Sequence, residues 1–195
     1  MKHIVGVDEA GRGPLAGPVS VGVACVFHDF DWSLLPGVTD SKKLSEKRRE
    51  EIFIRAKKLK RDGVLDYRVA MVHANSIDTR GINPCIRSAI QRAFRGLNLD
   101  PKETDVRLDG LLYAPKAFEM QQTIIKGDAK EKVIGLASIL AKVTRDRYMV
   151  RISKQYAEYD FHIHKGYGTK KHREAILENG VSDVHRRSYC RGLIS

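Results

Sequence analysis

The sequence predicts an α/β fold: a mixed five-stranded sheet flanked by helices, with a helical extension at the C-terminal end. Short apolar runs typical of strands open the chain, and further runs then alternate with segments of helical periodicity. The 195 residues show no repeat, linker or low-complexity tract. We therefore expect one main domain over residues 1–160 and a packed extension over residues 161–195.

The first elements are two strands, at residues 4–7 and 19–27, joined by a Gly/Pro-rich turn that suggests a hairpin. Ser45 is expected to cap a helix over residues 46–60, in which apolar residues recur at helical spacing. Gly63 ends this helix, and a third strand is predicted at residues 64–69.

The second half alternates helices with short strands. Residues 76–97 have the apolar spacing of a helix, and Pro84 lies near its start or breaks it in two. Strands at 105–108 and 122–125 complete the sheet. Further helices are predicted over three segments, at residues 133–148, 169–177 and, short and basic, 182–193.

The charge balance favours a polyanionic partner. Lys and Arg number 35 against 24 Asp and Glu, a formal net charge of +11, although a basic surface that serves only solubility stays open. The three distant cysteines argue against a disulfide framework or a zinc site and suit a reducing compartment. With no signal peptide and no apolar stretch that spans a bilayer, we expect a cytoplasmic location and no membrane partner.

Four acidic residues are candidate metal ligands because of their positions. Asp8 and Glu9 end the first strand, Asp109 ends a later strand, and Asp146 lies in the long helix. Carboxylates that converge at strand ends repel one another unless a cation lies between them, and oxygen ligands suit Mg²⁺ or Mn²⁺. Ordinary roles also stay open, a turn for Asp109 and an ion pair with Lys142 for Asp146.

The adjacent pair Asp8 and Glu9 presents a geometric difficulty, because neighbouring strand residues point to opposite faces. They share a site only if the strand ends or twists there, which the glycines of Gly11-Arg12-Gly13 allow. These glycines permit a close approach of backbone to ligand, and Arg12 suits a phosphate. A tight turn with a solvent-facing arginine is the alternative.

Six blocks of the sequence resemble the ribonuclease HII family, in the same order. They read VGVDEAGRGPLAGPV at 5–19, DSKKLS at 40–45, LDG at 108–110, KGD at 126–128, ASILAKVTRD at 137–146 and HKGY at 164–167. The first and fifth blocks are long and therefore specific. Two segments depart from the pattern: residues 129–135 lack a Pro/Ala-rich lead-in, and HRRSYC at 185–190 lacks the expected Phe-x-Pro.

The resemblance implies an RNase H-like fold in which Asp8, Glu9, Asp109 and Asp146 bind two Mg²⁺ or Mn²⁺ ions. It implies that Gly11, Arg12 and Gly13 contact the 2′-hydroxyl of a ribonucleotide. It also implies that Tyr167 packs on the sugar of the following deoxynucleotide, where a 2′-hydroxyl would be crowded. Further candidate substrate contacts in or near the matched blocks are Ser41, Lys42, Lys43, Lys142, Arg145, Arg186 and Arg187. For the lysines and arginines, a solvated surface role stays open.

The implied activity is hydrolysis of the phosphodiester on the 5′ side of a ribonucleotide in duplex DNA or an RNA/DNA hybrid. A monomer with two metal ions would leave 3′-hydroxyl and 5′-phosphate ends and serve ribonucleotide removal from DNA. One alternative is another carboxylate nuclease of this fold, such as a resolvase or integrase core, which would prefer branched DNA. The other is a basic nucleic-acid-binding module, which would bind without metal and cleave nothing.

Overall fold

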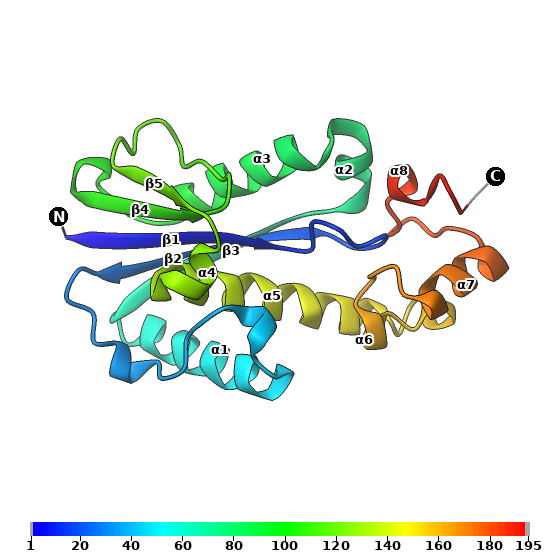
Figure 1. The fold of residues 1–195 in the computed structure, drawn as a ribbon, viewed down its shortest axis with the longest axis horizontal. Coiled ribbons are helices and arrows are strands. Elements are labelled where there is room, and N and C mark those ends of the chain that lie inside the picture. Colours follow the sequence, from blue (N-terminus) through cyan, green and yellow to red (C-terminus); the bar gives the residue numbers. More distant parts are fainter. Residues whose placement is uncertain (1, 194–195) are drawn as a thin grey trace.

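The computed structural model describes residues 2–193 and contains the mixed sheet that the sequence predicts (Figure 1). Its five strands lie in the order β3-β2-β1-β4-β5. The first three pair antiparallel, whereas β4 runs parallel to β1 and β5 parallel to β4. The bounds are β1 His3–Ala10, β2 Val19–Phe27, β3 Leu65–Val72, β4 Thr104–Asp109 and β5 Gln121–Ile124.

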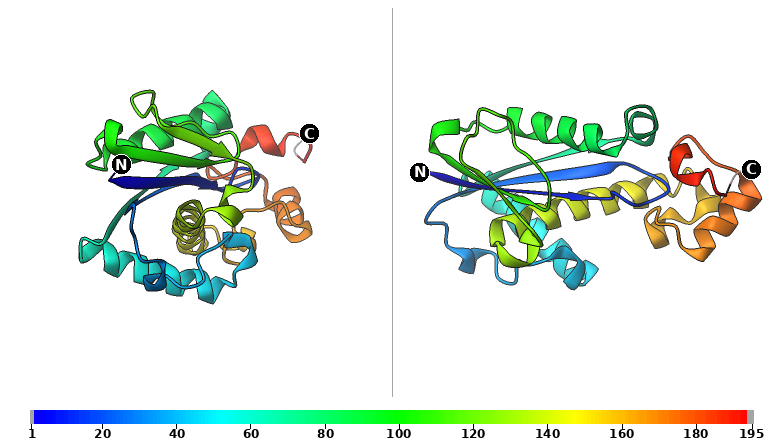
Figure 2. Two further views of the ribbon diagram at one scale, coloured as in Figure 1. Left: turned by 60° about the vertical axis from the view of Figure 1, so that its left-hand side comes forward. Right: turned by 45° about the horizontal axis from the view of Figure 1, so that its top comes forward.

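Helices cover both faces of this sheet (Figures 1 and 2). One face carries α2 Ala74–Arg80 and α3 Ile82–Arg95, and the other carries α1 Glu46–Arg61, α4 Gly127–Lys130 and α5 Lys132–Ile152. Three short helices, α6 Phe161–His164, α7 Lys170–Asn179 and α8 Arg187–Cys190, gather at one end. Within residues 2–193, no helix combines the length and the apolar character needed to cross a membrane.

The long helix α5 packs unusually close to β1 and β2 because glycines face it. A Cβ on Gly6 would lie 2.1 Å from the carbonyl oxygen of Val133, and one on Gly22 would lie 2.2 Å from that of Ala137. Alternate residues of β1, Val5 and Val7, join the core on the α3 face. Residue 8 therefore points toward α5, which determines where the first candidate carboxylate lies.

Several predicted bounds differ from the structure. The helical region 76–97 is two helices, and the break is at Gly81, whose φ of 81° belongs to the left-handed region. Pro84 lies in the first turn of α3, where its missing N–H breaks no hydrogen bond. The predicted last helix forms only over α8, and α5 continues four residues beyond its predicted end.

The C-terminal segment packs around the tip of the β1–β2 hairpin (Figure 2). Ala16 forms a bridge with His185, and the Gly17 N–H donates to the Val184 carbonyl. One buried apolar cluster joins residues from both sides of position 160, among them Met149, Phe161 and Ile176. The expected extension therefore shares its core with the main body. Residue 1 of the expected main domain and residues 194–195 of the expected extension lie outside the residues that the structure describes.

Candidate active site

Asp8 is a buried carboxylate on the face of β1 that α5 covers. It is 4% exposed. Burial raises the pKa of Asp8 well above its ordinary range, a hydrogen bond from Ser138 on α5 lowers it, and the charges of Glu9 and Asp109 raise it again. Within residues 2–193, Asp8 forms no ion pair with a lysine or arginine. The carboxyl group of Asp8 therefore has no direct ion-pair partner, and Lys42 interacts with it only at longer range.

Asp109 lies beside Asp8 because β1 and β4 are parallel neighbours. Val7 is paired with Leu108, so residues 8 and 109 follow side by side at the carboxyl ends of these strands. The Asp109 Oδ1 atom accepts a hydrogen bond of 2.7 Å from the Gly127 N–H at the start of α4. This part of the prediction, two distant acids brought to one sheet edge, agrees with the structure.

A third acid at this edge, Asp128, was not singled out in the sequence. It is 5% exposed, and burial raises its pKa, with further contributions from the charges of Asp40 and Asp109. The Lys42 Nζ atom lies 3.8 Å from its Oδ2 atom. The sequence signal that could have indicated it is that Asp40 and Asp128 each lie in a matched block, Asp40 in DSKKLS and Asp128 in KGD.

Glu9 leaves the sheet on the opposite face from Asp8. β1 does not end at this pair but continues to Ala10, with Asp8 opposite Gly22 and Glu9 opposite Val21. The Glu9 Oε1 atom accepts from the Arg12 Nε atom at 3.1 Å, and Arg12 also donates to Asn83 on α3. The expectation that the strand ends at Glu9 is wrong, because pairing with β2 continues past it.

Asp146 forms the local ion pair that the sequence left open. The Lys142 Nζ atom lies 3.0 Å from its Oδ1 atom, one helical turn earlier on α5. Within residues 2–193, no group of three or more His, Cys, Asp or Glu side chains is already arranged to bind one metal ion. The structure thus brings Asp8 and Asp109 together, whereas Glu9 forms an ion pair with Arg12 and Asp146 forms one with Lys142.

The two glycines of Gly11-Arg12-Gly13 have different environments. Gly11 is buried with a φ of 85°, and a Cβ there would lie 2.1 Å from the Arg145 Nε atom. Around Gly13, by contrast, a Cβ would meet no described atom within 4 Å. Gly11 is therefore required by internal packing, whereas the exposed backbone of Arg12 and Gly13 is open to a ligand.

Arg145 and Arg186 are not surface residues, which corrects their assignment as substrate contacts. Both are fully buried. Arg145 donates to the carbonyls of Pro18 and Ala16 at 2.8 and 3.1 Å. Arg186 donates to three more carbonyls, those of Gly17, Arg12 and Gly11, at 3.0, 2.9 and 2.6 Å. The two guanidinium groups therefore fix residues 11–18 from behind and contact no solvent.

Ser41 is likewise buried, and its hydroxyl lies 2.8 Å from that of Ser138, which in turn hydrogen-bonds Asp8. It supports Asp8 and has no exposed oxygen for a phosphate, contrary to the expectation. Lys42 and Lys43 are exposed beside it, as expected. The side chain of Arg187 is also exposed.

Tyr167 lies on the same side of the molecule as α5. It is 40% exposed, and its ring centroid lies 5.3 Å from the Lys142 Nζ atom and 5.4 Å from the Arg145 guanidinium. Cations at this distance from a ring stabilise its position. The exposed ring, Lys142 and the loop fixed by Arg145 therefore form one surface.

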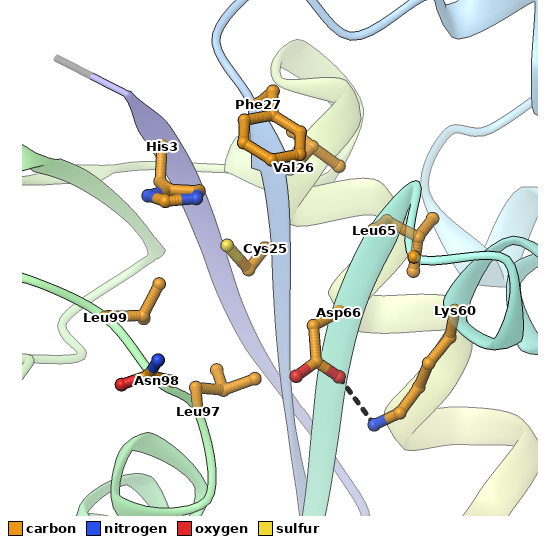
Figure 3. Close-up of a pocket in the computed structure, with 11 residues that line it drawn as sticks. His3, Cys25, Val26, Phe27, Lys60, Leu65, Asp66, Leu97, Asn98 and Leu99 are labelled. Carbon is orange, nitrogen blue, oxygen red and sulfur yellow. Dashed lines mark ion pairs between the residues drawn. The ribbon is translucent and has the colours of Figure 1, made fainter.

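A separate cavity of about 280 Å³ lies at the far end of the sheet, lined by residues that include His3, Cys25, Lys60 and Asp66 (Figure 3). Lys60 and Asp66, which both line it, form an ion pair with each other. Burial raises the pKa of the Cys25 thiol to about 12, so it is protonated at neutral pH and is a poor nucleophile. None of the predicted site residues lines this cavity.

Comparison with known proteins shows which family the chain is similar to. The family profile described as ribonuclease HII matches residues 5–192. The chain is 43% identical to ribonuclease HII of Aliarcobacter butzleri over 97% of this chain and 91% of that protein. It is 44% identical to ribonuclease HII of Caldicellulosiruptor bescii, over 100% and 89%.

A solved structure shares the fold as well. Ribonuclease H2 of Pyrococcus horikoshii superimposes with a TM-score of 0.75 at 30% identity, covering 98% of this chain and 96% of that one. The RNase H-like fold expected from the sequence is thereby confirmed. With the family match and the relatives spanning nearly its whole length, the chain belongs to the ribonuclease HII family of endoribonucleases.

Proposed function

We propose that this enzyme hydrolyses the phosphodiester on the 5′ side of a ribonucleotide in duplex DNA or an RNA/DNA hybrid. The products would carry 3′-hydroxyl and 5′-phosphate ends, and the role would be ribonucleotide removal from DNA. The observation that carries the proposal is Asp8, a buried carboxylate without an ion-pair partner, beside Asp109 at the ends of two parallel strands.

The residues at this edge fit a hard divalent cation. All donors are carboxylate oxygens, the type that Mg²⁺ and Mn²⁺ prefer. The charges of Asp109 and Glu9 raise the pKa of Asp8, and a cation between these acids would remove that repulsion. Asp8 and Asp109 would hold the first ion. Glu9 and Asp146 would complete a two-ion site by leaving Arg12 and Lys142, and Glu9, which leaves β1 on the opposite face from Asp8, would also have to turn around the end of the strand to reach the metal.

Bound metal ions would supply the hydroxide nucleophile and stabilise the departing 3′-oxygen. The protein's own groups would orient the reactants. Ser138 and Ser41 fix the Asp8 carboxylate, and the Gly127 N–H fixes that of Asp109. Lys142, released from Asp146, would lie near the negative charge of the scissile phosphate.

Selection of the ribonucleotide would depend on the Gly11-Arg12-Gly13 loop and on Tyr167. Arg12 and Gly13 are exposed residues, and the Arg186 guanidinium group behind them fixes the carbonyls of Gly11 and Arg12. Contacts from this backbone to a 2′-hydroxyl would distinguish RNA from DNA without reading a base. Tyr167 would pack on the next sugar, and Lys42 and Lys43 would bind phosphates, so binding would weaken with salt.

We also propose that the enzyme acts as a monomer in the cytoplasm. The three cysteines are all free and buried, which suits a reducing compartment. The net charge of +11 suits a nucleic-acid partner.

The test is cleavage of matched duplexes that carry zero, one or four ribonucleotides, with Mg²⁺, Mn²⁺ or a chelator. We expect metal-dependent cutting on the 5′ side of the ribonucleotide and none in the all-DNA duplex. Asp109→Asn should reduce cutting at least a hundredfold, while the exposed control Asp62→Asn at the end of α1 should not. Cutting of branched DNA without ribonucleotides, or metal-independent binding without cleavage, would contradict the proposal.

A further inference from the structure

Three buried histidines lie directly behind the Tyr167 loop, and the proposed chemistry uses none of them. They are His164 on α6, His172 on α7 and His185 before α8, exposed by 8%, 0% and 2%. The rings of His164 and His172 stack with centroids 4.4 Å apart. Within residues 2–193 they form no metal-binding group.

The hydrogen bonds of His185 and His172 fix the protons on both rings. The Ser182 N–H donates to the His185 Nδ1 atom at 3.0 Å, so Nδ1 is an acceptor and Nε2 carries the proton. The His172 Nδ1 atom lies 2.9 Å from the Tyr167 carbonyl oxygen, which can only accept, so Nδ1 is protonated there. The two Nε2 atoms are 3.1 Å apart, and His185 donates to His172.

A chain of hydrogen bonds with a single direction of donation thus runs from Ser182 through both rings to the backbone of Tyr167. Both imidazoles are neutral in it, and every ring nitrogen has a partner, with the His185 Nδ1 atom accepting from both the N–H and the hydroxyl of Ser182. Burial lowers the pKa of each ring to about 4, with coulombic contributions from the neighbouring histidines, so this neutral pair is the form present at neutral pH.

The His185 end of this hydrogen-bond chain is joined through backbone contacts to the hairpin that carries Gly11-Arg12-Gly13. His185 bridges Ala16, and the N–H of its neighbour Arg186 donates to the Leu15 carbonyl at 2.7 Å. His164 makes a second connection: its Nδ1 atom accepts from the Gly166 N–H, and the Gly166 carbonyl accepts from Leu15 and Ala16. The two loops proposed to contact substrate are therefore joined both directly, through the Gly166 carbonyl, and through the histidines.

We propose that His185 and His172 are positioning residues that set Tyr167 relative to the Gly11-Arg12-Gly13 loop, and thereby set the preference for a ribonucleotide followed by a deoxynucleotide. This inference rests on the proposed role of Tyr167. Neither histidine touches the substrate. Their effect passes through the backbone carbonyl of Tyr167 and through the pairing of residues 184–186 with the hairpin.

The experiment compares His185→Leu with His185→Gln. Leucine removes the hydrogen bond to His172, whereas the glutamine amide retains a donor at about the position of Nε2. The readout is the ratio of kcat/KM for a duplex with one ribonucleotide to kcat/KM for a continuous RNA/DNA hybrid. We expect His185→Leu to lower this ratio about tenfold, the effect of losing one buried hydrogen bond, and His185→Gln to stay within about twofold of the original enzyme.

A packing control separates positioning from a general loss of stability. Ile176→Ala on α7 removes a buried apolar side chain of the same cluster that makes none of the hydrogen bonds between the histidines. It should lower the melting temperature and leave the ratio unchanged. If His185→Leu does not fold, His185→Asn carries the test, because its amide is too short to reach His172 and should lower the ratio in the same way.

The outcomes distinguish this inference from the function on which it rests. If Tyr167→Ala abolishes the preference but folded His185→Leu keeps it, the histidine chain is only structural and the inference is wrong. An equal fall of the kcat/KM ratio in Ile176→Ala would also show that the histidine chain is only structural. If the original enzyme shows no preference, the proposed role of Tyr167 fails first and the inference fails with it.

Discussion

Replacing Arg186 by methionine should uncouple the substrate loop from the protein body. The guanidinium group is fully buried and donates to the carbonyls of Gly11, Arg12 and Gly17. Burial lowers its pKa to about 10, so it remains charged at neutral pH. Methionine fills the space of the aliphatic part of the arginine but has no donor, and it would leave these carbonyls without their partner.

The size of the expected loss in the free energy of unfolding depends on which of these carbonyls water can reach in the variant. Arg12 is exposed and its carbonyl can be solvated, whereas Gly11 and Gly17 are buried. Each buried carbonyl left unsatisfied costs about 1–3 kcal/mol, so we expect a loss of about 3 kcal/mol in the free energy of unfolding. At about 2–4 °C per kcal/mol for a chain of this size, the melting temperature should fall by roughly 6–12 °C.

The assays are a thermal melt and cleavage of a duplex with one ribonucleotide, measured below the melting transition. Arg187→Met is the matched control for the thermal melt, since this neighbouring side chain is exposed and its loss should cost less than about 0.5 kcal/mol. The kcat/KM of Arg186→Met should fall at least tenfold because the Arg12 and Gly13 backbone loses its fixed direction. A variant that melts like Arg187→Met and cleaves like the unaltered enzyme would refute the reasoning.

Three further predictions concern the same loop and the histidines behind it. Gly11→Ala should destabilise the protein by about 2 kcal/mol or more, because its φ of 85° and the close Arg145 Nε atom both oppose a Cβ; an unchanged urea midpoint would contradict this. Gly13→Ala should leave the urea midpoint unchanged and raise only the KM for substrate; a destabilisation equal to that of Gly11→Ala would show that Gly13 is also internally packed. Because the pKa values of His172 and His185 are about 4 when folded and near 6.5 when unfolded, the unfolded state binds more protons below pH 6.5. Stability should therefore fall between pH 6.5 and 4 by up to roughly 3 kcal/mol per ring, and an equal fall in His172→Phe would exclude this ring as a cause.

Local signals were sufficient to predict most of the fold. The Val-rich run at β2 and the Ser45 cap with its helical periodicity placed β2 and α1 almost residue for residue. The predicted helical region 76–97 is interrupted at Gly81 and not at Pro84. A residue with a left-handed φ interrupts a helix more effectively than a proline in its first turn.

The candidate site was predictable only in part, because long-range contacts determine it. The strand-end positions of Asp8 and Asp109 followed from the sequence, and parallel pairing of β1 with β4 makes them neighbours. The burial of Arg145 and Arg186 could not be foreseen, since a charged residue is expected at the surface unless partners are known. Those partners are backbone carbonyls more than 120 residues away in the chain.

The central claim is that Asp8 and Asp109 bind the divalent cation that the enzyme uses. The most direct measurement is anomalous X-ray diffraction from crystals soaked in Mn²⁺, with the soaked protein also shown to cut a duplex that contains one ribonucleotide. We predict an Mn²⁺ peak with carboxylate oxygens of both residues at roughly 2.0–2.6 Å. Mn²⁺ bound elsewhere in active protein, with both carboxylates uncoordinated, would contradict the account.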